Sequence, residues 1–510
     1  MPSQSRTKKS LLNSAVSMFF VAVQFLLGFY SRKIFLEYLG TEILGLNSTA
    51  VNILQFLNLT ELGIGAAVSF SLYKPLHHDD RATICEIVSL QGHLYKRIAG
   101  GIVVLSAVAM CFFPWIFSKM ELPLWYAYTS FAVLLWGALL GYYVNYRQIV
   151  LSASQLDYKI QFATRPWYII KILCQIAAMI YLTDPYVWWL VLEALFTTIS
   201  AISLRIVTNR EFPYLKNSAD TFANLRQKYN LIFVKVKQLF IHKIAGFALF
   251  QASPLIIYAY MSLTAVALYG NYIVVTNGVK TICSAVFSSI GAGIGDLVAE
   301  GDKNRIIKVF RELFCLRFLT AAIFAWGFIN LVQPFICVWI GPQYMLSTTA
   351  VVLLASLMFI DIVRNAVDLF INAYGLFSDV WAPITEATIN LSLSILFGYF
   401  WGLNGILSGA LVSLIVIVMI WKPYFLFTKG FRFPVIRYVL LMGKHLLIFA
   451  AIAIIMYFLL PNISINPAAS WGSWFRYSII SITIFSILIS TALILFRCGL
   501  GDFIERFRRK

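Results

Sequence analysis

The sequence is poor in charge, and above all in acidic residues. Of its 510 residues only 12% are charged, and 22 Asp and Glu stand against 40 Lys and Arg. A soluble globular chain carries about 25% charged residues and roughly 45–50% apolar ones, whereas 60% of this chain is hydrophobic. So little charge excludes an ordinary soluble protein of this length. Recurring apolar runs of 18 or more residues instead predict an all-α polytopic membrane protein.

Cysteines are few, and the signature motifs of enzymes are missing. The seven cysteines are scattered without a CxxC pair, so we expect small buried thiols rather than disulfides or a metal site. The chain has no GxxxxGK[ST], HExxH or GxSxG pattern. The segment GAGIGD (291–296) lies inside an apolar run without a preceding strand, which disfavours a nucleotide site. We therefore expect no metal and no cofactor.

Long hydrophobic runs are abundant. At roughly 35 residues for each span with its connection, the chain holds about fourteen transmembrane helices. The basic N-terminal segment MPSQSRTKKS precedes an apolar run that is too long for a signal peptide and lacks an A-x-A-like cleavage site, so we expect a retained helix. The expected spans are 11–36, 43–72, 98–118, 122–146, 161–182, 186–208, 239–260, 264–296, 313–340, 345–374, 381–400, 404–427, 435–460 and 472–497.

The basic residues predict the orientation of these spans. Lys and Arg, Lys422 among them, gather on alternate connections, while the other side shows only Lys119 and Arg476, plus Arg32 and Lys33 near the outer part of the first span. By the positive-inside rule both termini face the cytoplasm, and the net charge of +18 reflects topology rather than binding of nucleic acid. The connection after the sixth span is the most basic, with Arg205, Arg210, Lys216, Arg226, Lys228, Lys235, Lys237 and Lys243.

The connections on the external side are short. The longest, PNISINPAASWG, covers only residues 461–472. Membrane-embedded glycosyltransferases need larger external loops to carry catalytic residues. The sequence therefore predicts a transporter without a catalytic site, not an enzyme.

A shift of about 224 residues aligns the chain with itself. It pairs Asn47 with Asn271 and Arg81 with Arg305, and a shift of 222 pairs Asp157 with Asp379. An offset of six helices keeps the topology, so we expect two pseudo-symmetric six-helix bundles with a cavity between them. The alternative is the general likeness of any two helical hairpins. The expected divisions are an N-terminal bundle (1–215), a cytoplasmic linker (216–238), a C-terminal bundle (239–430), and an added helix pair with a basic tail (431–510).

Charged residues inside the spans are the candidate functional groups, because a charge at mid-helix costs about 2.5–3.5 kcal/mol on insertion scales. Asp361, Arg364 and Asp368 share one helix face at i, i+3, i+7, where they either serve function or neutralise one another. The full set is Arg32, Lys33, Glu61, Lys171, Glu193, Lys280, Asp361, Arg364, Asp368 and Glu386.

A polar stripe surrounds one of these charges. Asn277, Lys280, Ser284 and Ser288 follow helical spacing in the eighth span, and Gln24 belongs to a similar stripe in the first. Small-residue stripes also serve simple helix packing. A lysine within the stripe favours a water-filled cationic cavity, which suits an anionic substrate such as a diphosphate head group.

The segment RKIFLEYLGTEILGLNSTAVNILQFLNLTELGIGAAVSFSLYKPL (32–76), with ELGIG at 61–65, resembles the multidrug/oligosaccharidyl-lipid/polysaccharide (MOP) exporter superfamily. Within it the chain resembles the Wzx-type O-antigen and polysaccharide flippases. The resemblance implies a MATE-like pair of bundles in the bacterial inner membrane. It also implies alternating access that moves an undecaprenyl-diphosphate-linked oligosaccharide, for example a lipopolysaccharide precursor, from the cytoplasmic to the periplasmic leaflet.

The resemblance also implies roles for single residues. Cationic residues would hold the diphosphate: Arg32, Lys33, Lys171, Lys280 and Arg364. A proton or sodium gradient would act through an acidic residue: Glu61, Asp361, Asp368 or Glu386. Partners would be the lipid-linked oligosaccharide, the bilayer, and polysaccharide polymerase and chain-length proteins. Two alternatives remain open, a lipid II flippase, although no arginine triad is found, and a cation or drug antiporter, which predicts an acidic cavity.

Overall fold

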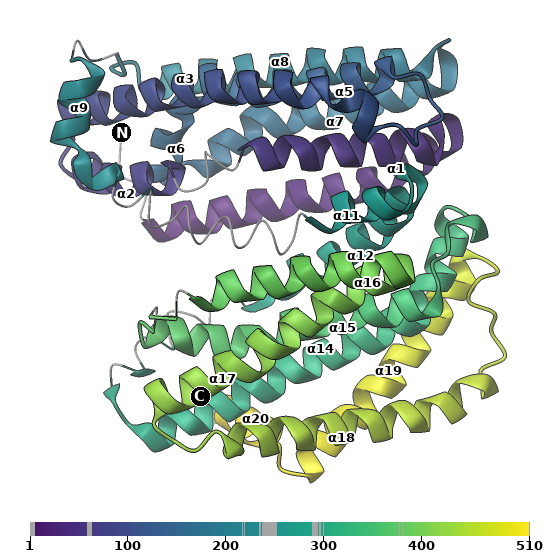
Figure 1. Ribbon diagram of the computed structural model, residues 1–510. Helices are drawn as coiled ribbons and strands as arrows, with labels where there is room; N and C mark the ends of the chain where they lie inside the picture. The colour runs from purple at the N-terminus through teal and green to yellow at the C-terminus, as the bar shows by residue number, and fades with distance from the viewer. Residues whose placement is uncertain are drawn as a thin grey trace. The chain divides into compact units, whose positions relative to one another are not determined.

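The computed structural model describes residues 6–58, 64–216, 218, 220–233, 236, 252–287, 294, 297–298, 300–376, 378–379 and 381–508. Every regular element in this part of the chain is helical, and none is a strand (Figure 1). The predicted all-α fold is therefore confirmed. The chain divides into two compact units, Met1–Ala267 and Leu268–Lys510.

The first unit is built from helices that pack side by side, with α7 lying along both α1 and α8. Gly40 is the non-helical residue that divides α1 into two arms. The elements are α1 (Arg6–Leu57), α2 (Ile64–His77), α3 (Arg81–Cys111), α4 (Phe113–Ile116), α5 (Trp125–Tyr143), η2 (Tyr146–Gln148), α6 (Ile149–Ala153), α7 (Asp157–Tyr181), α8 (Pro185–Glu211), α9 (Phe222–Lys228), α11 (Ala252–Tyr260) and the start of α12 (Leu263–Phe287).

The second unit takes in the rest of α12 and is centred on α14, which packs along α15 and α19. Two of its segments, η4 and η5, are π-helical. The elements are α14 (Lys303–Trp339), η3 (Pro342–Tyr344), α15 (Thr348–Ala373), α16 (Trp381–Ser413), η4 (Leu414–Trp421), α17 (Lys422–Phe425), η5 (Leu426–Phe431), α18 (Ile436–Leu459), η6 (Leu460–Asn462), α19 (Trp471–Leu495) and α20 (Leu500–Arg508).

The helices agree with the predicted spans, which number about fourteen. Among the described residues, eight helical stretches are long and apolar enough to cross a membrane, or nine if α5 and the bent segment after it count as one span. Two of these stretches hold more than one predicted span, since α1 includes the first and part of the second, and the stretch that begins with α16 includes the eleventh and twelfth. In the structure the boundary between the two compact units falls between residues 267 and 268. The cytoplasmic linker predicted at 216–238 stays a prediction.

A glycine makes α16 reverse its direction. Gly402 has φ 53° and ψ −131°, a conformation that a residue with a Cβ rarely adopts. The two arms then lie against each other, and the Ser394 hydroxyl donates to the Ile406 carbonyl at 2.9 Å. A Cβ on Gly405 would lie only 1.9 Å from the Phe397 carbonyl oxygen. The close approach of these backbones therefore depends on glycine.

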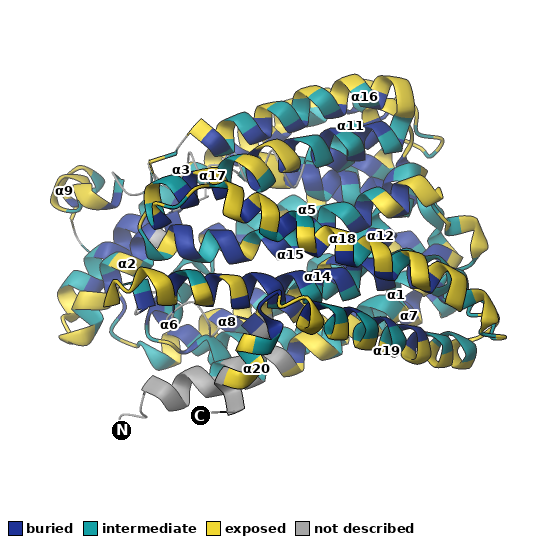
Figure 2. Ribbon diagram, turned by 90° about the horizontal axis from the view of Figure 1, so that it is seen from below, coloured by how far each residue is buried: buried dark blue, intermediate teal, exposed yellow. Residues whose placement is uncertain are grey.

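Apolar residues cover both faces of the helices, as expected in lipid. In α18 the buried residues are spaced three or four apart, from Tyr438 to Met456. Its other face is equally apolar, with Leu447 73% exposed and Leu440 65% exposed. Figure 2 shows the alternation of exposed and buried residues along such helices. An apolar face left uncovered by protein is typical of a helix that contacts hydrocarbon.

Polar residues and thiols are buried at defined places. Asn47 and Asn271, which the internal repeat aligns, are both buried. Asn47 accepts hydrogen bonds from Ser130 at 2.6 Å and from Tyr186 at 3.1 Å, so it joins α1 to α5 and α8. The seven cysteines are free thiols, of which three are buried and Cys111 is exposed.

Candidate functional site

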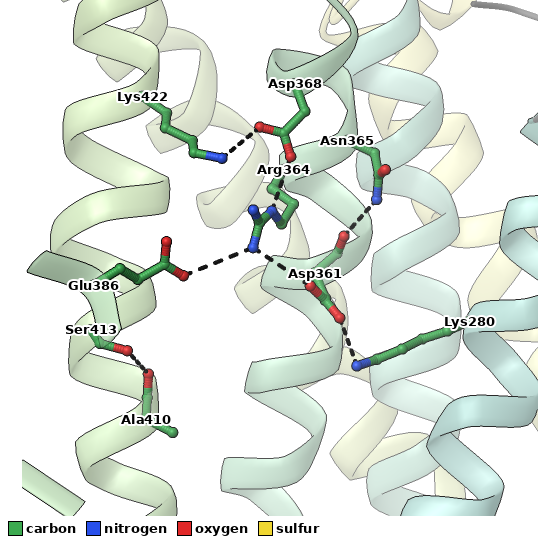
Figure 3. A network of polar contacts seen from close by, with 9 residues as sticks. All are labelled: Lys280, Asp361, Arg364, Asn365, Asp368, Glu386, Ala410, Ser413 and Lys422. Carbon is green, nitrogen blue, oxygen red and sulfur yellow. Dashed lines mark hydrogen bonds and ion pairs between the residues drawn. The ribbon is translucent and has the colours of Figure 1, made fainter. Parts of the chain in front are cut away.

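The predicted charged face of α15 is the centre of an ion-pair network in the second unit (Figure 3). Arg364 donates through Nε to an Asp368 carboxylate oxygen at 3.0 Å. Its Nη1 lies 3.9 Å from a carboxylate oxygen of Asp361. The spacing i, i+3, i+7 therefore brings the three side chains together, as the sequence predicts.

Two lysines from other helices pair with the aspartates on this face of α15. The Lys280 Nζ atom, from α12, lies 2.6 Å from Asp361 Oδ2. The Lys422 Nζ atom, from α17, lies 2.9 Å from Asp368 Oδ1. Each aspartate thus has a lysine of its own in addition to Arg364. The sequence assigned Lys422 to a cytoplasmic connection, whereas the structure places it in the network.

Glu386, on α16, is the sixth member of the network and is held differently. Its side chain is only 2% exposed, and its Oε1 atom lies 3.9 Å from Arg364 Nη1. No hydrogen bond reaches that oxygen from the described residues. Among these residues Arg364 is its one ion-pair partner, so Glu386 is the most weakly satisfied carboxylate of the six charges.

The network is formally neutral. It contains the three cations Lys280, Arg364 and Lys422 and three carboxylates, a sum of +3 − 3 = 0. The sequence left open whether the α15 charges neutralise one another. In the structure they do so together with Lys280, Lys422 and Glu386.

A smaller pair occupies the first unit. Lys171 Nζ, on α7, lies 2.6 Å from Glu193 Oε1, on α8. The amide of Gln175 donates to the other oxygen of Glu193 at 3.1 Å. The ammonium group also lies 4.7 Å from the centre of the Tyr168 ring. The sequence named Lys171 and Glu193 as separate intramembrane charges without pairing them.

Of the other predicted residues, Gln24, Arg32 and Lys33 lie on α1, and Asn277 and Ser284 lie on α12. Arg32, on α1, donates to the Ala267 carbonyl at 3.5 Å. Lys33 is exposed and has no ion pair among the described residues. Gln24 accepts from Arg165 at 2.7 Å. Of the polar stripe, Asn277 and Ser284 are exposed. Glu61 and Ser288 lie outside the described residues.

Sequence reasoning also missed a buried arginine. Arg317, on α14, is 6% exposed, and its guanidinium lies 3.8 Å from the centre of the Phe287 ring. In the described ranges no carboxylate pairs with it. Arg317 follows Lys303, Arg305, Lys308 and Arg311, a basic run that is typical of a cytoplasmic segment. Its distance of six residues from Arg311 is the signal in the sequence that it lies deeper. Within the same ranges no three His, Cys, Asp or Glu side chains converge on a metal site.

Comparison with known proteins identifies the fold. No protein-family model matches the chain, and no curated protein is similar enough to serve as a relative. Among solved structures, the inward closed conformation of the lipid II flippase MurJ has a TM-score of 0.65 at 14% identity, and the match covers 97% of this chain and 100% of that one. An inward-facing MATE family multidrug resistance transporter of the MOP superfamily has a TM-score of 0.57 at 14% identity, with 79% and 94% covered. The chain therefore has the fold of these membrane transporters, with two MATE-like bundles and an added C-terminal helix pair.

Proposed function

We propose that the chain is a flippase that moves an undecaprenyl-diphosphate-linked oligosaccharide from the cytoplasmic to the periplasmic leaflet of the bacterial inner membrane. The observation that carries this proposal is the likeness to the MurJ flippase over nearly the whole of both chains. The short predicted external connections support transport rather than catalysis. The termini would lie in the cytoplasm, and polysaccharide polymerase and chain-length proteins would act on the product.

The ion-pair network would couple transport to a proton gradient through Glu386. Arg364 is shared among three carboxylates. Asp361 and Asp368 each have a lysine partner as well, whereas Glu386 has none among the described residues. A proton on Glu386 would release Arg364 toward Asp361 and Asp368 and so weaken the attraction between α15 and α16. One proton that crosses 100 mV supplies about 2.3 kcal/mol, enough to shift an equilibrium between two conformations.

The diphosphate would be held by cations that carboxylates do not already neutralise. Lys171, Lys280 and Arg364 each lie in an ion pair, so their positive charge is offset locally. Lys33 is exposed on α1 and keeps its charge. It would therefore be a contact for the diphosphate.

Deletion and complementation test this function in the source organism. Deletion of the gene is expected to remove surface polysaccharide while growth continues, and the wild-type gene restores it. Lys33→Gln should restore it poorly at normal membrane levels of the protein. Arg476→Gln removes an exposed basic residue from the same predicted side and should restore it fully. Normal surface polysaccharide in the deletion strain would contradict the proposal.

A second candidate is a lipid II flippase, which the likeness to MurJ favours. It predicts that depletion of the protein stops growth through loss of peptidoglycan synthesis. A known lipid II flippase should then rescue growth, and surface polysaccharide should persist until growth stops. The two candidates are thus separated by one strain, since the first predicts viable cells without polysaccharide. A drug antiporter would instead leave both phenotypes normal and change drug sensitivity.

A further inference from the structure

A cationic cavity lies on the first unit, and none of its lining residues belongs to the ion pairs described above. It has a volume of about 440 Å³ and is open on one side. Its lining comes from the middle of α3 and from α9 with Asn230, which follows it. The lining residues are Arg97, Phe222, Ala223, Arg226, Gln227 and Asn230.

The two arginines present their donors to this cavity. The Arg97 guanidinium carbon lies over the Phe222 ring, 3.7 Å from its centre. Such stacking leaves the N–H edges of a guanidinium available for hydrogen bonds. Arg226 lies 5.4 Å from the centre of the Phe233 ring in the same way. Gln227 and Asn230 add amide donors beside them.

Among the described residues no acidic side chain lines the cavity. The nearest carboxylate on α3, Glu86, accepts from Lys228 at 2.6 Å and from Tyr229 at 2.5 Å. The hydrogen bond that Lys228 donates to Glu86 raises the pKa of Lys228. Neither Arg97 nor Arg226 forms an ion pair with any described residue. The cavity thus keeps two permanent positive charges, since arginine stays protonated at any physiological pH.

The position of the cavity indicates the source of an anion. It adjoins α9, which follows the predicted sixth span in the most basic connection of the chain, with eight basic and two acidic residues over 205–243, a sum of +8 − 2 = +6. The helix buries Leu225 fully against the unit and exposes Arg226 and Gln227. A basic segment of this kind next to a membrane span meets the head groups of the adjacent leaflet.

We propose that this cavity binds the phosphodiester head group of an anionic phospholipid of the surrounding bilayer. Arg97 and Arg226 would pair with the phosphate oxygens, and Gln227 and Asn230 would donate to the polar part of the head group. The open side leaves the acyl chains in the bilayer. Bound lipid would hold α9 against α3. This inference does not depend on which substrate the protein transports.

The test uses the full chain in detergent and native mass spectrometry. Dioleoyl phosphatidylglycerol is the probe, and dioleoyl phosphatidylcholine is the zwitterionic comparison with the same acyl chains. Phosphatidylglycerol should bind in preference. Arg97→Gln and Arg226→Gln should each weaken its binding about fivefold, as expected for loss of one basic residue at a membrane surface. Both positions are exposed, so monodisperse elution is expected and is checked for each variant.

Lys96→Gln is the matched control. Lys96 is exposed and adjacent to Arg97 on α3, but it does not line the cavity. Its removal deletes the same charge and should leave lipid binding within twofold. Equal weakening by Lys96→Gln and Arg97→Gln would overturn the proposal in favour of unspecific attraction. So would equal retention of the two lipids, or displacement of phosphatidylglycerol by millimolar inorganic phosphate, which would indicate a site for free phosphate.

Discussion

Loss of the Arg364 charge should show which carboxylate of the network depends on Arg364 for its charge compensation. In Arg364→Gln, Asp361 keeps Lys280 at 2.6 Å and Asp368 keeps Lys422 at 2.9 Å. Glu386 loses its one ion-pair partner among the described residues while staying 2% exposed. The variant therefore leaves one buried carboxylate uncompensated, and that carboxylate is Glu386.

The expected loss in stability follows from this geometry. Two unit charges about 4 Å apart attract by about 4 kcal/mol at an effective dielectric constant of about 20. Removal of one partner of a buried pair costs about 3–5 kcal/mol in measured cases. We expect Arg364→Gln to lose free energy of unfolding in this range. Glu386→Gln should cost no more than about 1 kcal/mol, because it removes the desolvation penalty together with the attraction.

A double-mutant cycle measures the coupling between these two residues. Unfolding by SDS in mixed micelles gives the free energy for the wild type, both single variants and the double variant. Arg364→Gln with Glu386→Gln should recover at least about 2 kcal/mol of the loss caused by Arg364→Gln alone. Additive effects, or a loss below about 1 kcal/mol in Arg364→Gln, would refute the assignment of Arg364 as the partner of Glu386.

Two further predictions concern packing and pairing elsewhere. Gly405→Ala should abolish monodisperse elution in size-exclusion chromatography, because the added Cβ would overlap the Phe397 carbonyl. Gly443→Ala is the control and should elute as the wild type does, because no atom lies within 4 Å of the added Cβ. Equal elution of the two variants would contradict the hairpin at Gly402. Lys171→Met should lower the thermal unfolding temperature because the half-buried Glu193 loses its lysine partner. Addition of Glu193→Leu should restore most of the unfolding temperature, whereas no recovery would show that the pair is not the cause.

Much of the fold could be predicted from the sequence because its causes are local. Hydrophobic runs of sufficient length predict spans, and the boundaries near Gly402 agree with the predicted gap between 400 and 404. The repeat was equally visible, and its paired residues Asn47 and Asn271 are both buried. Apolar composition does not reveal which face of a helix contacts lipid. Leu447 and Ile448 are adjacent and both apolar, yet Leu447 is exposed and Ile448 is buried.

The site was only half predictable. The face formed by Asp361, Arg364 and Asp368 follows from helical periodicity within one segment. Lys422 does not, because it comes from another helix and directly follows the π-helical segment Leu414–Trp421. A π-helix has a different number of residues per turn from an α-helix, so it rotates every later side chain about the axis. Counting by 3.6 residues therefore gives the wrong direction for Lys422.

Partners across helices also decide what an intramembrane charge means. Lys280 indicates a cationic cavity when it is read within its own helix, since its helical neighbours are Asn277 and Ser284. With Asp361 at 2.6 Å the same ammonium belongs to a neutral network. Arg97 and Arg226 show the opposite case. The positive-inside rule alone is enough to account for basic residues at such positions, yet both line one cavity that has no carboxylate among its described lining residues. An anion is attracted by charge that remains after pairing, so the places to seek anionic ligands are the basic residues that the fold leaves without acids.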